Sequence, residues 1–438
     1  MNHTGADRRS LGAYSLMALP LAFGGMPLYI YMPDFYVREW GISLSVVGII
    51  VLVLRCLDAG QDLVIGHLCD RHPAHRGYVM AGSVLLLALG MAAVLYGPPV
   101  AGMATAWFAM AIATAALGLS VMNINMALVG GFWQTQAEGR LRVAAWRESF
   151  TLAGMMLAAA LPFILQRHID AADSFAVLFW VFAVLLAAGA FFFRRFWMRH
   201  GAVFGRADEK VGWRFFDGNR AFFAACFLTH LAASLPAALF LFFVRDYMGA
   251  AEAAGLFMLL YLGSGIAGMP FWQRLAARHG QVWAWMMSMA LAVAAFGATL
   301  VIAPGNMVAF ALICVLSGAA LGADLSIPPA MMAARLAARG QAAQGSRAFA
   351  VMNMIPKIAL GVASCGALLA LGAAGYQAGA ADNTPRVLAL LAALYAGVPC
   401  VMKLGAAWML HLSEKGFKEG VNDEVSERSD GDGRSCGA

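Results

Sequence analysis

The chain has 438 residues, of which 61% are hydrophobic and 12% are charged, and its formal net charge is +6. Its mean hydropathy is +0.72, whereas a soluble domain has only about 45–50% apolar residues. The composition therefore excludes a soluble globular protein and predicts a polytopic membrane protein.

Apolar stretches long enough to cross a bilayer as helices recur along nearly the whole chain. We expect an all-α polytopic membrane protein with twelve transmembrane helices in two pseudo-symmetric six-helix bundles. The predicted spans are 13–35, 44–66, 78–97, 101–130, 143–165, 174–194, 219–245, 252–274, 282–303, 305–333, 348–374 and 387–411. The first lacks a small-residue cleavage site after a short apolar core, so we expect it to be retained.

Lys and Arg gather at the N-terminal head and in the connections that follow the even-numbered spans. The positive-inside rule then predicts that both termini are cytoplasmic, in a multi-pass protein of the plasma (inner) membrane. The net positive charge reflects this topology, so nucleic acid is not an expected partner. The basic residues in question are Arg8, Arg9, Arg71, Arg76, Arg140, Arg142, Arg194, Arg195, Arg199, Arg206, Lys210, Arg214, Arg278, Arg335, Arg339 and Arg347.

The longest polar interval between spans divides the chain into two halves that weakly resemble each other. The second and eighth spans both end in a Gly-led segment that runs into a basic loop. The fourth and tenth spans carry polar residues at matching depth, in "LGLSVMNINMAL" (117–128) and "LGADLSIPPAMM" (321–332). Repeated halves of this kind are typical of secondary transporters. The expected units are an N-terminal bundle (1–194), a cytoplasmic central loop (195–218), a C-terminal bundle (219–411) and a disordered cytoplasmic tail (412–438).

Three formal charges lie close together inside the second apolar span. Arg55, Asp58 and Asp62 occupy positions i, i+3 and i+7, with Gln61 beside them, so one helix face carries all of them. A charge in the bilayer is costly unless it is paired or hydrated, so this face should line a bundle interior or a water-filled path. The two acids leave a local negative charge that a proton or small cation could neutralise. The alternative is a structural ion pair that only joins helices.

The first two spans resemble the glycoside–pentoside–hexuronide:cation symporters, the melibiose permease group within the major facilitator superfamily. The resemblance rests on "RCLDAGQDLVIGHLCDR" (55–71), on "RLRVAAWRESFTLAG" (140–154) and on the segment 345–376, and it covers most of the chain. It implies cation-coupled symport of a sugar or glycoside. It also implies that Asp58 and Asp62 bind the coupling cation, and that Lys357 approaches these acids.

This chain departs from that family's pattern at several positions. Gln61 stands where the family often has asparagine, and Asn123 where melibiose permeases have a helix-four carboxylate, and we expect both to belong to the cation-binding and coupling site. Ala22 replaces the acid that holds the sugar there. After the tenth span the family often reads "A-D-x-x-D", whereas this chain reads "AARLAARGQ" (333–341). We therefore expect an altered cytoplasmic gate and assume no galactoside substrate.

Other polar residues in the apolar spans are candidates for substrate binding. Asp324 precedes a proline pair that frees backbone carbonyls; we expect it to bind substrate or a proton, or else to pair with Lys357 or Arg147. By the resemblance Arg147 faces the sugar, the alternative being an interface pair with Glu148. Lys403 is expected to snorkel. The remaining substrate-binding candidates are Asn125 and the aromatic Tyr29.

The loop between the second and third spans contains a set of charges, Asp70, Arg71 and Arg76, that resembles the superfamily's loop motif. A carboxylate at the C-terminal end of a helix is unfavourable for the helix dipole. We therefore expect Asp70 to have a partner on another helix and to form a gating salt bridge.

Together these features predict a cation-coupled symporter of a small polar solute, a sugar or glycoside, with a lysolipid-like amphiphile as the alternative substrate. The coupling ion is a proton or sodium; Gln61 would crowd a tight oxygen cage, which favours protons. A membrane enzyme or sensor would need a nucleophile–base set or a metal cluster, and the seven scattered cysteines have no metal-ligand spacing. We expect no cofactor, no metal site, a monomer, and as partners only the solute, the cation and the lipid bilayer.

Overall fold

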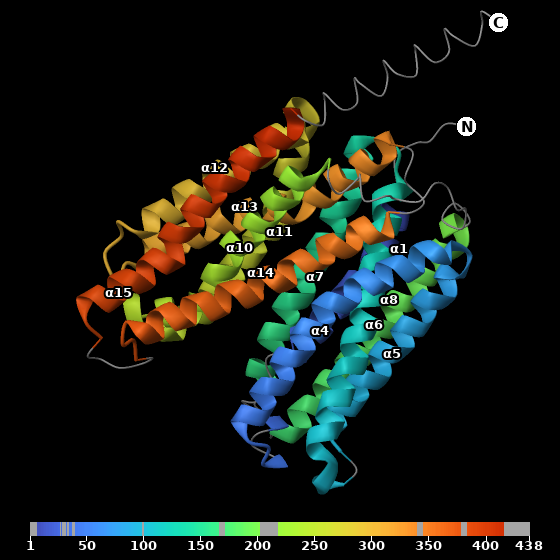
Figure 1. Cartoon of the computed structure of the whole chain (residues 1–438), viewed down its shortest axis with the longest axis horizontal. Helices are drawn as coiled ribbons and strands as arrows, with labels where there is room; N and C mark the ends of the chain where they lie inside the picture. Colours follow the sequence, from blue (N-terminus) through green and yellow to red (C-terminus); the bar gives the residue numbers. More distant parts are fainter. Residues whose placement is uncertain are drawn as a thin grey trace, which may run out of the picture.

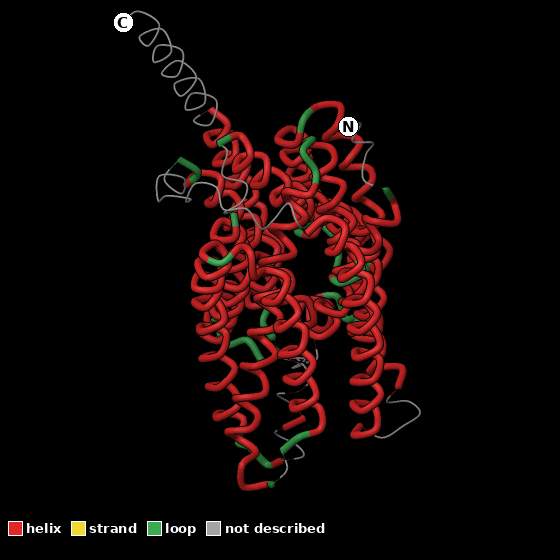
Figure 2. Tube along the Cα trace, turned by 90° about the vertical axis from the view of Figure 1, so that its right-hand side faces the viewer, coloured by secondary structure: helices red, strands yellow, loops and turns green. Residues whose placement is uncertain are grey.

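A computed structural model describes residues 7–26, 28, 32, 35–36, 40–98, 100–165, 171–201, 218–339, 345–377 and 383–415. Within these ranges the chain is built from helices and connecting loops (Figure 2). The helices form two groups, one from each half of the sequence, which lie side by side (Figure 1). The expected all-α membrane fold is confirmed.

The N-terminal half contributes the blue to green helices of Figure 1. Its helix α4 begins where the side chain of Ser43 accepts a hydrogen bond from the backbone N–H of Val46. The helices of this half are α1 (Arg8–Ser15), α2 (Ala18–Met26), α4 (Leu44–Arg71), α5 (Arg76–Tyr96), α6 (Ala104–Trp133), α7 (Ala137–Leu165) and α8 (Ala171–His200).

The C-terminal half contributes the yellow-green to red helices. Asn306 caps the N-terminus of α13, and Thr384 caps that of α15. The elements are α10 (Arg220–Phe242), η5 (Phe243–Tyr247), α11 (Ala254–His279), α12 (Gln281–Thr299), α13 (Met307–Ala338), α14 (Ser346–Ala373), α15 (Pro385–Ala392) and η8 (Ala393–Gly397), after which the last helix continues to Lys415.

Nine helices among the described residues are long and apolar enough to cross a membrane. They correspond to nine of the twelve predicted spans. The other three, 13–35, 44–66 and 143–165, contain positions or side chains outside the described part of the chain. These three spans therefore stay predictions, although helices α2, α4 and α7 lie within or across them.

Several helices extend further than hydropathy predicts, and three of them do so at an end that carries basic residues. Helix α4 ends at Arg71 rather than 66, α8 at His200 rather than 194, and α13 at Ala338 rather than 333. Arg, Leu and Ala have a high helix propensity whether or not they lie in lipid, so the helix continues past the apolar segment. For the same reason the last helix continues to Lys415, past the expected start of the tail at 412; residues 416–438 lie outside the described part.

The two halves meet mainly where α4 packs against α14 and where α7 packs against α11 and α13. Glycine allows the first of these contacts. A Cβ atom built on Gly66 would lie 2.7 Å from the Cβ of Ala350 and 3.0 Å from the carbonyl oxygen of Ser346. Small residues let the backbones of membrane helices approach closely in this way.

Adding a methyl group at this contact is expected to destabilise the protein. In Gly66→Ala the new Cβ meets α14 backbone and side-chain atoms that have no room to move, so we expect a loss of about 1–3 kcal/mol. Gly60→Ala on the same helix is the matched control, because a Cβ there has nothing within 4 Å. The measurement is thermal unfolding of the purified variants, with the melting temperature as the readout. Equal melting of the two variants would show that α4 and α14 do not pack this closely.

Candidate functional site

The charged face of α4 meets α6 and α14 in a buried cluster centred on the ammonium group of Lys357. The Nζ atom lies 2.8 Å from Asp58 Oδ2, and 3.0 Å and 2.8 Å from the two carboxylate oxygens of Asp62. The fourth side-chain oxygen beside it is the Oγ of Ser120 on α6, at 2.8 Å. One cation from the C-terminal half is therefore surrounded by oxygen atoms from the N-terminal half.

Amide and hydroxyl groups hold the two carboxylates in place. Gln61 Nε2 donates to Asp58 Oδ1 at 2.7 Å, and Ser120 Oγ donates to the same oxygen at 2.9 Å. Asn353 Nδ2, one turn before Lys357 on α14, donates to Asp62 Oδ2 at 2.9 Å. The Asp58 residue is 7% exposed and Asp62 is fully buried. Both acids are thus oriented before any ligand binds.

Among its described side chains, the cluster contains more negative than positive charge. Two carboxylates surround one ammonium group, which leaves one formal negative charge; the side chain of Arg55 lies outside the described residues. Carboxylate, hydroxyl and amide oxygens are the ligand types that hard cations prefer. A buried excess charge is costly, so this arrangement is chemically suited to hold a proton or a small cation.

A second contact joins α4 to α14 at the end where α4 stops and α14 starts. Asp70 Oδ1 accepts a hydrogen bond from the backbone N–H of Ser346 at 3.0 Å, and Oδ2 accepts one from that of Arg347 at 3.1 Å. A carboxylate is favourable at a helix N-terminus, which offsets its unfavourable place at the end of α4. Asp70 therefore has the cross-helix partner we expected. That partner is mainly the first turn of α14; the Arg347 Nε atom is 4.0 Å away.

The two arginines of the loop motif differ in their surroundings. Arg76 is 1% exposed and donates to Ser346 Oγ at 3.2 Å and to the carbonyl of Cys69 at 3.4 Å. Arg71 is exposed at the end of α4. Only Asp70 and Arg76 of the predicted gating set therefore belong to the contact between the bundles.

A third buried charge pair lies inside the C-terminal half and corrects two expectations. Asp324 Oδ2 accepts a hydrogen bond from Lys403 Nζ, and Oδ1 accepts one from Trp285 Nε1 at 3.0 Å. Asp324 therefore pairs with neither Lys357 nor Arg147. Lys403 is 2% exposed and does not snorkel, because its ammonium group is neutralised where it lies.

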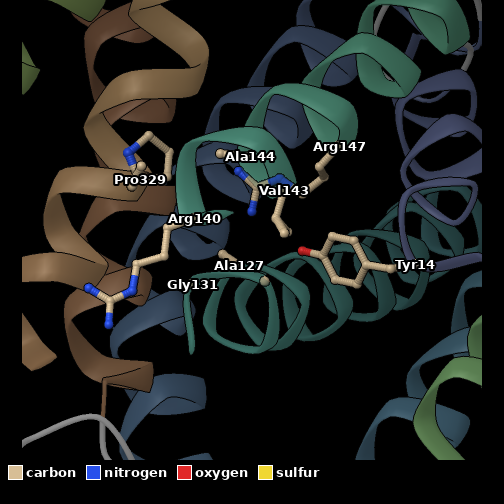
Figure 3. Close-up of a pocket in the computed structure, with 10 residues that line it drawn as sticks. Tyr14, Ala127, Gly131, Arg140, Val143, Ala144, Arg147 and Pro329 are labelled. Carbon is tan, nitrogen blue, oxygen red and sulfur yellow. The ribbon is translucent and has the colours of Figure 1, made fainter. Parts of the chain in front are cut away.

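A small cavity opens between α7 and α13 (Figure 3). Arg147 lies on its wall and binds Glu148 Oε1 through Nε and NH2, at 2.9 Å and 2.6 Å. The cavity measures about 10 Å³, which is too small for a sugar ring. Arg147 would meet a solute only if α7 and α13 stood further apart.

The remaining candidates are dispersed. Asn125 is fully buried and donates to the carbonyl of Val121 at 2.8 Å and to Cys69 Sγ at 3.4 Å, so its amide group is turned into the bundle. Asn123 is exposed on α6. Tyr29 lies outside the described residues.

The residue that the sequence reasoning missed is Asn353; the available signal was its position one turn before a lysine in an apolar run.

Comparison with known proteins gives a consistent result. Residues 13–414 match the family model described as MFS/sugar transport protein. The inner membrane symporter YicJ of Escherichia coli (strain K12) is 33% identical over 139 residues. This match spans 30% of each of the two chains.

Solved structures share the fold at low identity. A bacterial homologue of the iron transporter ferroportin, in an outward-facing state, is 17% identical with a TM-score of 0.73, and the match covers 93% of this chain and 99% of that one. The fucose:proton symporter FucP of E. coli is 13% identical with a TM-score of 0.64, over 93% of this chain and 99% of that one. At these identities the likeness establishes the fold alone.

Proposed function

The chain belongs to the MFS/sugar transport protein family, and from this membership we propose that it is a secondary active transporter that couples movement of a sugar or glycoside to a cation. The observation that carries the proposal is the bridge from Lys357 to Asp58 and Asp62, which joins the two bundles through exchangeable charge. The partly matching relative is itself a symporter of the inner membrane, which supports symport and the same location. Both termini are cytoplasmic in this proposal, and the monomer is the working unit.

Cation binding and movement of the bundles are linked through Lys357. A cation bound at Asp58 or Asp62 removes the charge that attracts the ammonium group, so α14 is released from α4 at this point. Alternating access also requires Asp70 to leave the N-terminus of α14. The two contacts together close one end of the path, and both part when that end opens.

Within this proposal the proton is the favoured coupling ion. The ammonium group of Lys357 already lies among four side-chain oxygens at 2.8–3.0 Å. A proton needs only to neutralise one carboxylate, whereas sodium would first have to displace this ammonium group. Gln61, which binds Asp58, is also longer than asparagine and narrows the space for a sodium ion.

The test is to record external pH while glycosides, uronates, pentosides and lysolipids are added one at a time to weakly buffered cells making the protein. We expect one compound to cause sustained alkalinisation in the absence of sodium, and we expect Asp58→Asn cells not to respond. A response to lysolipids alone would show that the substrate is a lysolipid-like amphiphile and not a sugar. Uptake stimulated by sodium without a pH change would show that sodium is the coupling ion. No response to any compound would contradict the proposal.

A further inference from the structure

Helix α10 carries two polar side chains, one turn apart, that have no hydrogen-bond partner among the described residues. His230 and Ser234 occupy positions i and i+4, so they share one face of the helix. His230 is partly exposed and Ser234 is 9% exposed, and neither contributes a fully enclosed polar atom. Both side chains therefore present polar atoms to a space beside α10.

The hydroxyl group of Ser234 differs from those of serines in other spans. A serine inside an apolar helix often bonds to the carbonyl of the preceding turn. Ser149 donates in this way to the carbonyl of Ala145 at 2.8 Å, and Ser326 to that of Gly322 at 2.6 Å. Within the described part of the chain Ser234 makes no such bond. Its hydroxyl group thus remains a donor and an acceptor for another ligand.

His230 and Ser234 lie deep in the membrane-spanning part of α10. His230 is ten residues after Arg220, where the helix begins, which places it about 15 Å along the axis. Half of a hydrocarbon core is about this thick. Lipid offers no hydrogen-bond partners, so polar atoms that are accessible at this depth line a water-filled path. The other described histidines lie at or near helix ends: His67, His72, His75, His200, His279 and His411.

The buried pair of Asp324 and Lys403 lies close enough to His230 for both charges to act on the imidazole ring. Asp324 already binds Lys403 and Trp285 Nε1, so the pair adds no net charge beside the ring. A neutral imidazole carries one N–H donor and one acceptor nitrogen. This part of the path is therefore suited to an uncharged ligand that both donates and accepts hydrogen bonds.

We propose that His230 and Ser234 bind the transported solute from the C-terminal half, and that this solute is uncharged and carries several hydroxyl groups. The inference rests on the proposed function and narrows the solute to neutral sugars and glycosides. A solute hydroxyl can donate to the acceptor nitrogen of the imidazole or accept from its N–H, and a second can bind Ser234 one turn along. A uronate would bring its carboxylate to a face whose neighbouring cation, Lys403, is already paired with Asp324.

The proposed solute contact is separate from the cation cluster. Asp58, Asp62 and Ser120 surround Lys357 from α4 and α6, whereas the solute contact belongs to α10. Helix α10 packs against α14, which carries Lys357 (Figure 1). Solute bound on α10 and a cation bound beside Lys357 would therefore act on neighbouring helices.

The first test is the uptake kinetics of labelled methyl β-galactoside, methyl α-glucoside, methyl β-xyloside and glucuronate in cells making the protein. We expect uptake of at least one of the neutral glycosides and none of glucuronate. For that glycoside, His230→Leu should raise KM about tenfold with little change in Vmax, because the hydrogen bonds of the ring to the solute are lost. His230→Gln keeps a donor and an acceptor and should raise KM less. Ser234→Ala should raise KM about threefold, and the control His411→Leu, at an exposed position near a helix end, should leave it unchanged.

Chemical modification covers the case in which His230→Leu does not fold. Diethyl pyrocarbonate should modify His230 of the unmodified protein in membrane vesicles, as measured by mass spectrometry. The glycoside that is taken up should slow this reaction at His230 but not at His411.

The outcomes separate this inference from the proposed function. An unreactive His230, a reaction that none of the three glycosides slows, or an unchanged KM in His230→Leu would overturn the solute contact and leave symport in place. Uptake of glucuronate instead of the glycosides would overturn the neutral class of solute. No uptake of any of the four compounds by the unmodified protein would contradict both the solute contact and the proposed function.

Discussion

Replacement of Asp62 with asparagine is expected to abolish accumulation of the solute against its gradient while the protein remains folded and inserted. The amide would keep the shape of the side chain but remove the charge that faces Lys357 Nζ at 2.8 Å. Asp58 then becomes the single countercharge of the ammonium group, and the cluster has no excess negative charge with which to take up a cation. Asp58→Asn should have the same effect.

The measurement is uphill uptake and, separately, exchange of labelled solute across the membrane in the absence of a gradient. Exchange should persist in Asp62→Asn, because Asp58 alone then holds Lys357 and α14 can leave α4 without a bound cation. Glu252→Gln is the control, since it neutralises an acid exposed at the start of a short helical turn. If Asp62→Asn accumulated solute like the unmodified protein, the cluster would be a structural ion pair.

The largest loss of stability is expected from Lys403→Met. This change leaves the carboxylate of Asp324, in a residue only 6% exposed, with Trp285 Nε1 as its remaining donor. An unpaired buried charge of this kind costs about 3–5 kcal/mol. The double variant Lys403→Met with Asp324→Asn should recover most of the lost stability, because both charges of the pair are then removed.

Unfolding of the purified proteins would measure this, with the four members of the double-mutant cycle compared under one condition. Lys415→Met is the control: it removes a lysine from the same helix at an exposed position, and should change stability by no more than about 0.5 kcal/mol. If Lys403→Met were as stable as this control, Asp324 would have to be neutral or paired elsewhere.

The helices and the central charge cluster were predictable because hydropathy and isolated charges report on depth in the membrane. Asp58 and Asp62 are conspicuous in an apolar run, and Lys357 is equally so. Their meeting on α4 and α14 followed from the family resemblance rather than from spacing, and the distances support it.

The rotation of each helix about its axis was much less predictable. A helix that is apolar on all sides gives no periodic signal for the direction of a single polar side chain. For this reason the alternative ion-pair partners named for Asp324, Lys357 and Arg147, were wrong, and Lys403 was placed at the membrane surface.

Helix α14 contacts α4 at two points, its first turn and Lys357. Asp70 holds its first turn, and Asp58 and Asp62 hold Lys357 eleven residues later. Eleven residues of helix span about 16 Å, so a tilt of about 10° at Lys357 would displace the first turn by about 3 Å. That displacement exceeds what two hydrogen bonds can follow. In the proposed transport cycle, a tilt that follows neutralisation of one carboxylate at Lys357 would therefore break the contact between Asp70 and the first turn of α14.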